Sequence, residues 1–244
     1  MNTHPTLGWP IVTAKNCFQI VRDLGIQQWS QLTDPMPIES FLKSATDEQR
    51  VCHDKFAPKS FAIQHLNPLD DSVFDAFRVE YKPYSLVIAL IDETYIAVTA
   101  EWKHGNNRIS IVPVCGVAGK EEEHLLTLAE KMEATAIREW HEETGTELET
   151  ITPLSSKHGT FHSVRNSEAR CFSYLGKVKT GAKKGAHNHD TTEQLIILLF
   201  PYSEWLVLLE DNSLFDANPD FGLEDCARAS TYAALRQLGK LQLV

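Results

Sequence analysis

The feature that most constrains this chain is a cluster of three glutamates at the end of one predicted helix. Residues 138–145 read Arg-Glu-Trp-His-Glu-Glu-Thr-Gly, and a glycine in the last position commonly ends a helix. Residues three and four apart share a helix face, so Glu139 points to the same side as Glu142 and Glu143. Their charges repel one another and lie at the negative end of the helix dipole. The cluster is therefore either a solvated surface or a cation site, and carboxylate oxygens favour Mg²⁺ or Mn²⁺.

A wider frame around these acids favours the cation site. Glu130 stands eight positions before Arg138, and small or apolar residues between them can pack: Ala134, Ala136 and Ile137. The pattern predicts a helix over about residues 130–144, ended by Gly145. This order resembles the Nudix box, whose pattern is a glycine, five residues, a glutamate, seven residues, Arg-Glu, a bulky apolar residue, any residue, Glu-Glu, any residue and Gly.

The chain departs from the Nudix pattern at its first glycine. That glycine should fall at position 124, where the chain has His124. Residues 117–120, Val-Ala-Gly-Lys, look like the Pro-Ala-Gly entry to the box in the ADP-ribose pyrophosphatase branch, with Gly119 as the glycine. Ten residues instead of five then separate Gly119 from Glu130, so we predict an insertion of about one helical turn over residues 121–128.

Composition and charge argue against several classes of protein. The chain has 244 residues, of which 43% are hydrophobic, enough for the core of a globular protein. A net charge of −10 argues against nucleic acid as the partner, because such binding rests on Lys and Arg. No apolar run approaches the roughly 18–20 residues of a membrane span, and residues 1–5 lack a signal-peptide pattern, so we expect a cytoplasmic protein without a membrane partner. The five cysteines include no CxxC pair and indicate neither a disulfide framework nor a zinc site.

Hydrophobic periodicity predicts a mixed α/β fold. Strands, two of them forming a hairpin, are expected at residues 86–91, 95–102, 108–115, 147–154, 159–163, 169–177 and 195–200. Helices are expected at residues 38–53, 130–144, 203–209 and 223–238. This mixture indicates an α/β/α sandwich around a mixed sheet. Residues 1–82 read differently and form an N-terminal extension to a domain over residues 83–244.

Matches to the Nudix family continue on both sides of the box. Residues 101–104, Glu-Trp-Lys-His, look like the family's Gln-Tyr-Arg-His element, and residues 192–196 look like the entry to the last core strand. The likeness covers roughly residues 86–238. Relatives of this branch often carry an extra β-rich N-terminal piece that helps to make a dimer. The resemblance therefore implies a homodimer in which residues 1–82 take part.

The resemblance assigns roles to residues of the box. The ligands of a bound Mg²⁺ or Mn²⁺ would be three carboxylates and one backbone carbonyl, those of Glu139, Glu142, Glu143 and Ala118. Arg138 would pair with Glu130 or with a box carboxylate and orient it. The motif is completed by Gly119 and Gly145.

Hydrolysis also needs a group that activates or orients water. In this branch it is usually a glutamate in the loop before the last strand, and the carboxylates nearest to that place are Glu193 and Asp190. We favour Glu193, although it also fits an exposed residue at the start of a strand. Further candidates are His189 and Glu168.

Substrate contacts are expected from the strand before the glycine loop. Lys103 can bind phosphate, and Trp102 or Phe161 can stack on a base, although a tryptophan on a strand commonly belongs to the core. Four cations would either steer an anionic substrate or keep their loop soluble, namely Lys177, Lys179, Lys183 and Lys184.

Together these residues predict an enzyme that hydrolyses the diphosphate in a nucleoside diphosphate linked to a second group. The resemblance implies ADP-ribose or a nucleotide sugar as the small-molecule partner and Mg²⁺ or Mn²⁺ as the cofactor. The alternative is a Nudix domain that senses ADP-ribose or a related nucleotide without cleaving it. The inserted turn and the unsettled water-activating group favour the sensor, whereas three intact glutamates favour the enzyme.

Overall fold

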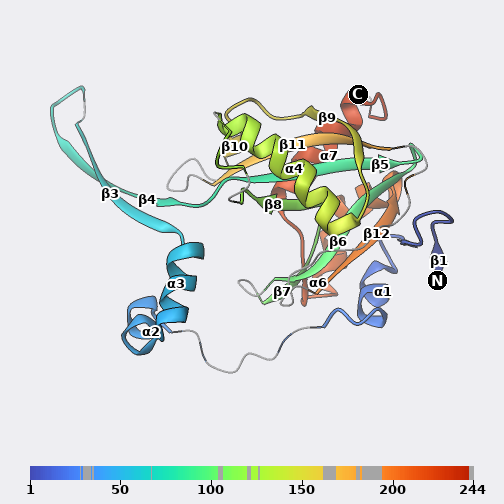
Figure 1. Cartoon of the computed structure of the whole chain (residues 1–244), viewed down its shortest axis with the longest axis horizontal. Coiled ribbons are helices and arrows are strands. Elements are labelled where there is room, and N and C mark those ends of the chain that lie inside the picture. Colours follow the sequence, from blue (N-terminus) through green and yellow to red (C-terminus); the bar gives the residue numbers. More distant parts are fainter. Residues whose placement is uncertain are drawn as a thin grey trace. The chain divides into compact units, whose positions relative to one another are not determined.

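The structure is a computed structural model of the chain, and it divides into two compact units (Figure 1). It describes residues 1–27, 29, 34, 36–66, 68–103, 107–119, 122–125, 127–161, 169–179, 182 and 194–241. The larger unit contains Met1–Trp29, Pro83–Thr160 and Cys171–Val244. The smaller unit contains Ser30–Lys82 and Phe161–Arg170.

One mixed sheet, of eleven strands within the described residues, forms the centre of the larger unit. Its main path runs β1-β2-β12-β6-β5-β11-β10, while β7 pairs with β6, β13 with β7, β8 with β5 and β9 with β11. β5 and β11 are parallel neighbours, as are β2 and β12, and β7 and β13. The strands are β1 (Asn2–Thr3), β2 (Pro10–Ile11), β5 (Tyr84–Ile91), β6 (Tyr95–Lys103), β7 (Arg108–Val112), β8 (Cys115–Val117), β9 (Leu148–Pro153), β10 (Thr160–Phe161), β11 (Arg170–Val178), β12 (Leu195–Pro201) and β13 (Phe221–Gly222).

The predicted hairpin is confirmed as β5 and β6, which pair Leu90 with Ile96 beside the turn. Two turn residues, Asp92 and Glu93, have φ of 48° and 56°, the left-handed region that primed hairpin turns require. The ring of His4 hydrogen-bonds the Asp92 carboxylate at 2.9 Å and fastens the N-terminus to this turn. The strand predicted over residues 108–115 is instead two short strands, β7 and β8, and they pair with different neighbours, β6 and β5.

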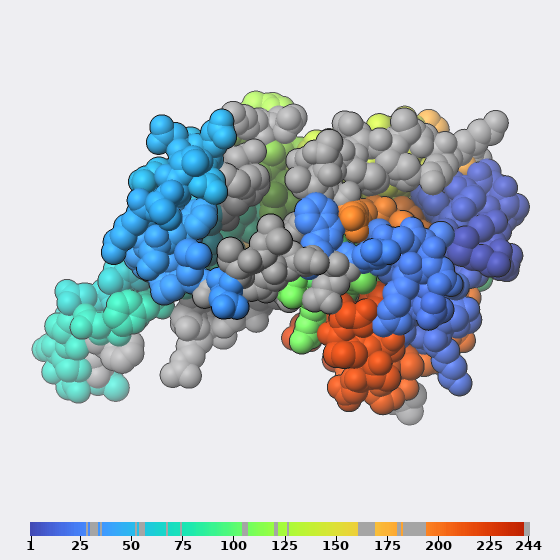
Figure 2. Space-filling view, turned by 90° about the horizontal axis from the view of Figure 1, so that it is seen from below, coloured from blue at the N-terminus to red at the C-terminus, as the bar shows by residue number. Residues whose placement is uncertain are grey.

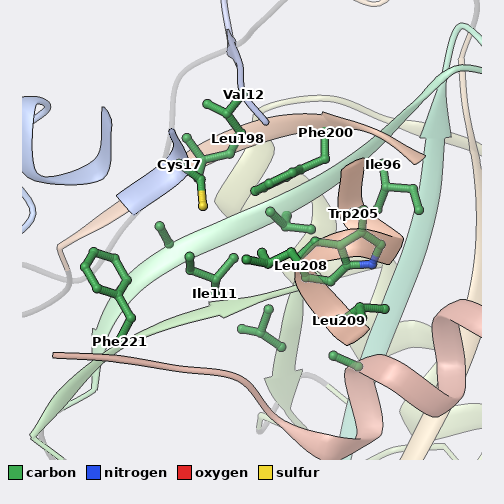
Figure 3. Close-up of a cluster of buried hydrophobic side chains, with 14 of the residues drawn as sticks. Val12, Cys17, Ile96, Ile111, Leu198, Phe200, Trp205, Leu208, Leu209 and Phe221 are labelled. Atoms are coloured by element: carbon green, nitrogen blue, oxygen red, sulfur yellow. The ribbon is translucent and has the colours of Figure 1, made fainter. Parts of the chain in front are cut away.

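Helices cover both faces of the sheet. On one face, α4 (Leu128–Thr144) buries Met132, Ala136 and Trp140 against strand residues such as Val87 and Leu199. The other face carries α1 (Cys17–Asp23), α5 (Tyr202–Glu210) and α7 (Asp225–Gln237), and α6 (Asn212–Asp216) follows α5. Figure 3 shows the apolar side chains that meet on that second face, among them Phe200, Trp205 and Phe221. This arrangement confirms the mixed α/β prediction. No helix among the described residues is both long and apolar enough to cross a membrane.

Residues 1–29 belong to the larger unit, so the chain divides differently from the predicted extension over residues 1–82. Trp9 and Val12 are 2% and 0% exposed. Arg22 on α1 holds Asp220 through two donors, with Nη2 2.8 Å from Oδ1 and Nε 3.2 Å from Oδ2. Figure 2 shows the blue residues of this segment directly against the red C-terminal part of the unit. A buried tryptophan and a partly exposed ion pair thus tie the N-terminus to the larger unit.

Within residues 36–66 and 68–82, the smaller unit contains two helices and a two-stranded ribbon. The helix predicted over residues 38–53 is broken into α2 (Ile38–Ser44) and α3 (Asp47–Phe56). Thr46 breaks it because its backbone is extended and its side chain caps α3, accepting a hydrogen bond from the Gln49 N–H. The ribbon pairs β3 (Lys59–Leu66) with β4 (Val73–Glu80) in antiparallel register. Participation of this unit in a dimer stays a prediction.

Candidate functional site

The box helix α4 has the predicted end and a slightly earlier start. Thr127 is the N-cap and forms a capping box with Glu130, whose carboxylate accepts from the Thr127 N–H at 2.8 Å. Gly145 ends the helix with φ 64° and ψ 16°, a left-handed cap that glycine adopts without strain. The predicted pairing of Arg138 with Glu130 is not what the structure shows. Glu130 instead caps the start of the helix. In the predicted insertion, residues 122–124 form a turn and not an additional helical segment.

Arg138 lies at the centre of the carboxylate cluster and contacts three carboxylates. Its Nη1 donates to Glu142 at 2.6 Å and its Nη2 lies 2.9 Å from Glu139 Oε1. Its Nε donates to Glu122 at 2.7 Å, and Nη2 also reaches the carbonyl of Val117 at 3.0 Å. Burial alone would lower the pKa of Arg138, but these carboxylates raise it, so the guanidinium stays charged. The predicted pairing of Arg138 with a box carboxylate is therefore present, with two of them.

Glu122 links Arg138 to the glycine loop. This role of Glu122 was not predicted from the sequence. Its side chain is 4% exposed, one oxygen accepts from Arg138, and the other accepts from the Gly119 N–H at 2.7 Å. Burial alone would raise the pKa of Glu122, but the hydrogen bonds from Arg138 and Gly119 lower it. Residues 121–123 are three glutamates in a row, and no periodicity in a short loop tells which one turns inward.

Glu139 lies directly over the backbone of β8. A Cβ atom added to Gly116 would fall 2.0 Å from Glu139 Cδ and 2.3 Å from its Oε1, far inside contact distance. Gly116 therefore provides the space in which this carboxylate sits. The family's loop pattern had pointed to Gly119 and not to Gly116.

A second set of charges surrounds Cys115 at the start of β8. Lys103 forms an ion pair with Glu101, two residues earlier on β6. Burial alone would lower the pKa of Lys103, but Cys115, Glu101 and Glu143 outweigh it and raise the pKa. Burial also raises the pKa of the Cys115 thiol, with Lys103 opposing and Glu224, Glu143 and Glu101 adding to the rise. Glu143, the last box carboxylate, thus lies within electrostatic reach of Lys103, while Glu139 and Glu142 bind Arg138.

The donor set suits a hard divalent cation by type, because carboxylate oxygens are the preferred ligands of Mg²⁺. The three box carboxylates do not converge on a common point for a metal ion, because Arg138 forms ion pairs with two of them. Within the part of the chain that the structure describes, no group of three or more His, Cys, Asp or Glu side chains is placed to hold a metal ion. A rotation of Glu142, whose side chain is 34% exposed, would be needed to release it from Arg138.

The remaining predicted site residues fall into four groups. Trp102 is 3% exposed and belongs to the core, so its indole is not available to stack on a base. Ala118 packs against the core cluster beneath α4, which fixes the loop next to Gly119. Lys177 and Lys179 form exposed ion pairs with glutamates of and next to β9. Outside the described residues lie Glu168, Lys183, Lys184, His189, Asp190, Glu193 and the side chain of Phe161.

A polar cavity of about 930 Å³ lies at the edge of the sheet, near the charged residues around Cys115. β7 contributes Ser110, whose register partner on β6 is Glu101. Glu224, which lines the cavity just before α7, also acts on the Cys115 thiol. The other charged lining residues are Arg108, Asp216, Asp225 and Arg228. The volume falls within the range of sites for small molecules.

Comparisons with known proteins give the fold. No family model matches the sequence, and no curated protein matches it. The crystal structure of an ADP compounds hydrolase is similar to this chain, with a TM-score of 0.56 and 14% sequence identity. The match covers 89% of this chain and 99% of that chain. At this identity the similarity establishes a shared fold.

Proposed function

We propose that this protein is a metal-dependent Nudix-type hydrolase that cleaves the diphosphate in a nucleoside diphosphate linked to a second group, ADP-ribose or a nucleotide sugar. The observation that carries the proposal is the setting of the box carboxylates. Glu139 occupies the space that Gly116 leaves on β8, and Arg138 holds Glu139 and Glu142 beside the glycine loop. The similar structure of an ADP compounds hydrolase supports the same class of substrate.

The protein's own residues position the charges for this reaction. Arg138, anchored by buried Glu122 and by the Val117 carbonyl, fixes two carboxylates at the end of α4. A divalent cation bound there would offset the repulsion between these carboxylates and the phosphates of a substrate. Lys103 is about one third exposed and within electrostatic reach of Glu143, and its charge would attract a phosphate oxygen.

The second candidate function is a sensor that binds such a nucleotide without cleaving it. The observation that favours it is the guanidinium of Arg138, which neutralises Glu139 and Glu142 as a metal ion would. A domain that keeps its carboxylates neutralised this way can bind a ligand without recruiting a cation. The two functions differ in one measurable property, the release of product in the presence of Mg²⁺ or Mn²⁺.

The deciding experiment compares the wild type with the double variant Glu142→Gln/Glu143→Gln. Each is incubated with Mg²⁺ or Mn²⁺ and ADP-ribose, nucleotide sugars, NADH, dinucleoside polyphosphates or nucleoside triphosphates, and the products are separated and identified. We expect the wild type to cleave ADP-ribose or a nucleotide sugar only with the cation, and the double variant to lose at least about 100-fold in rate, since a bound metal contributes several kcal/mol to such reactions.

Glu133→Gln is the matched control, because Glu133 is an exposed glutamate on the same helix. It should leave the rate unchanged, and unfolding in urea should show that all variants are folded. Undiminished turnover by the double variant would contradict the assigned role of these carboxylates. Calorimetric binding of ADP-ribose by the wild type, with no product released, would support the sensor instead.

A further inference from the structure

Two cysteines, Cys171 on β11 and Cys226 in the first turn of α7, contact each other on the sheet face opposite α4. We propose that they are a redox-sensitive pair, which a peroxide converts into an intramolecular disulfide and a thiol reductant restores. Neither residue belongs to the carboxylate cluster, so the proposal stands independently of the proposed function. Both thiols are reduced in the structure.

The contacts around the two sulfur atoms bring three elements together. Cys171 and Cys226 share a side-chain hydrogen bond. The hydroxyl of Tyr84 on β5 donates to Cys226 Sγ at 3.0 Å, and Cys171 is the register partner of Tyr84. Ser173 Oγ lies 3.6 Å from Cys171 Sγ and bonds Ser230 of α7 at 2.6 Å. These polar contacts hold the start of α7 against β11, so the two thiols face the same small cavity.

A small oxidant has room to reach both thiols. A cavity of about 120 Å³ is lined by Cys171 and Cys226 together with Ser173 and Ser230. That volume exceeds the roughly 30 Å³ that one water molecule occupies in the liquid. Cys226 is half-buried, whereas Cys171 is 2% exposed, so the cavity is the approach to Cys171.

The surroundings also distinguish this pair from the other cysteines of the larger unit. The hydrogen bond from Cys226, joined by those from Ser173 and Tyr84, lowers the pKa of Cys171 despite its burial. Burial raises the pKa of Cys17 to about 12 and raises that of Cys115 well above its usual range. Because the thiolate is the form that reacts with peroxide, Cys171 is the thiol expected to react first.

The chemistry balances in two steps. The Cys171 thiolate attacks one oxygen of hydrogen peroxide and the O–O bond breaks, giving a sulfenic acid at Cys171 and a hydroxide that takes up a proton as water. The Cys226 sulfur then attacks the Cys171 sulfur, the S–O bond breaks, and a second hydroxide leaves with the Cys226 proton as water. Two thiols and one peroxide thus yield one disulfide and two waters.

The cross-link would fix the start of α7 to the sheet. Glu224, Asp225 and Arg228 from the same stretch line the larger cavity at the sheet edge. Oxidation would also take away the thiol that accepts the Tyr84 hydrogen bond. The state of the two cysteines is thereby coupled to the shape of that cavity.

The test uses the full chain with Cys52→Ser, which removes the cysteine of the smaller unit and prevents its cross-linking. The protein is treated with hydrogen peroxide, free thiols are counted under denaturing conditions, and unreduced peptides are mapped by mass spectrometry. We expect the loss of two thiols, a mass lower by about 2 Da, a peptide pair joining Cys171 to Cys226, and reversal by dithiothreitol. The oxidised protein should also unfold at a higher urea concentration, because the cross-link restrains the unfolded chain.

Further variants separate this pair from general oxidation. Cys226→Ser keeps a hydrogen-bond donor beside Cys171 and should stop at a Cys171 sulfenic acid, which a dimedone probe traps, while Cys115→Ser should still form the disulfide. If either replacement fails to fold, the peptide map of the folded Cys52→Ser protein still decides the matter. Unchanged thiols under peroxide, or oxidation of Cys171 to sulfinic acid without a cross-link, would overturn the proposal.

Discussion

The two ends of α4 carry glutamates of the same sequence motif but use them in opposite ways. At the start, Glu130 joins Thr127 in a capping box, where a negative charge is favourable for the helix. At the end, Glu139, Glu142 and Glu143 add negative charge where the helix dipole is already negative. One glutamate therefore stabilises the start of the helix, whereas three glutamates destabilise its end.

Under the proposed function, this difference separates the part of the motif that stabilises the fold from the part that would act on the substrate. The start of the helix is stabilised by Thr127 and Glu130, which are three positions apart in the sequence. The second end needs contacts from elsewhere in the chain, above all Glu122 and Gly116, to keep Arg138 and Glu139 in place. Variants at the two ends should accordingly separate loss of activity from loss of stability.

The largest effect is expected at the carboxylate end from Gly116→Ala. The new Cβ would lie 2.0 Å from Glu139 Cδ, so the carboxylate must leave its position over β8. Under the proposed metal-binding role of Glu139, a shift of this size costs on the order of 100-fold in rate. We expect the loss of stability to stay below about 1 kcal/mol, because the partly exposed carboxylate gives up one ion pair with Arg138. The measurements are kcat with the substrate found in the screen and urea unfolding.

Gly222→Ala is the matched control for stability, because its Cβ would meet only Arg108 Cδ at an ordinary 3.7 Å. Both variants should then unfold close to the wild type. Full activity in Gly116→Ala would mean that the position of Glu139 over β8 is irrelevant to turnover. A large loss of stability in that variant would mean that the carboxylate end also serves the fold.

Local patterns in the sequence predicted most elements of the larger unit. Residues 195–200 read as a continuous apolar run because β12 is covered on both faces, and Gly145 marked the end of α4 because a left-handed cap favours glycine. The hairpin of β5 and β6 was predicted for a similar reason, since two apolar runs flank a short polar turn. These features depend on residues close together in the chain.

Contacts between distant residues could not be predicted in this way. Glu122 bonds Arg138 sixteen positions later, and Gly116 faces Glu139 from another element. Trp102 and Lys103 are adjacent on β6, yet Trp102 is in the core and Lys103 pairs with Glu101, because neighbouring strand residues point to opposite faces. The pairing of segments decides such placements, and a single sequence does not give that pairing.

A smaller effect is expected from Glu122→Gln, which tests the support of the carboxylate end. The variant keeps the shape of the side chain but loses its charge toward Arg138 and the Gly119 N–H, so we expect a loss of about 2 kcal/mol in unfolding free energy at pH 7. Because the folded-state pKa of Glu122 is lowered, its contribution is fully present above the unfolded-state value of about 4.3. It is lost as the pH falls through the folded-state pKa.

The wild type should therefore lose stability more steeply than Glu122→Gln when urea unfolding is repeated below about pH 4.3, and the gap between the two proteins should narrow. Glu123→Gln, next in sequence and exposed, provides the control for removing one charge. A gap that stays constant down to the lowest pH would show that the charge of Glu122 is not what stabilises the loop.

The smallest effect is expected at the other end of the helix, from Thr127→Ala. The variant loses the side-chain oxygen that accepts the Glu130 N–H at 3.2 Å, and the loss of an N-cap costs about 1 kcal/mol. Thr127→Ser keeps that oxygen and should restore the stability, as urea unfolding would show. The catalytic rate of the folded protein should be the same in both, because the capping-box hydrogen bonds join Thr127 to Glu130, whereas Arg138 bonds Glu122 and Glu142. A change in kcat that Thr127→Ser does not correct would mean that the two ends of α4 are coupled, and that the division between a folding end and a functional end is wrong.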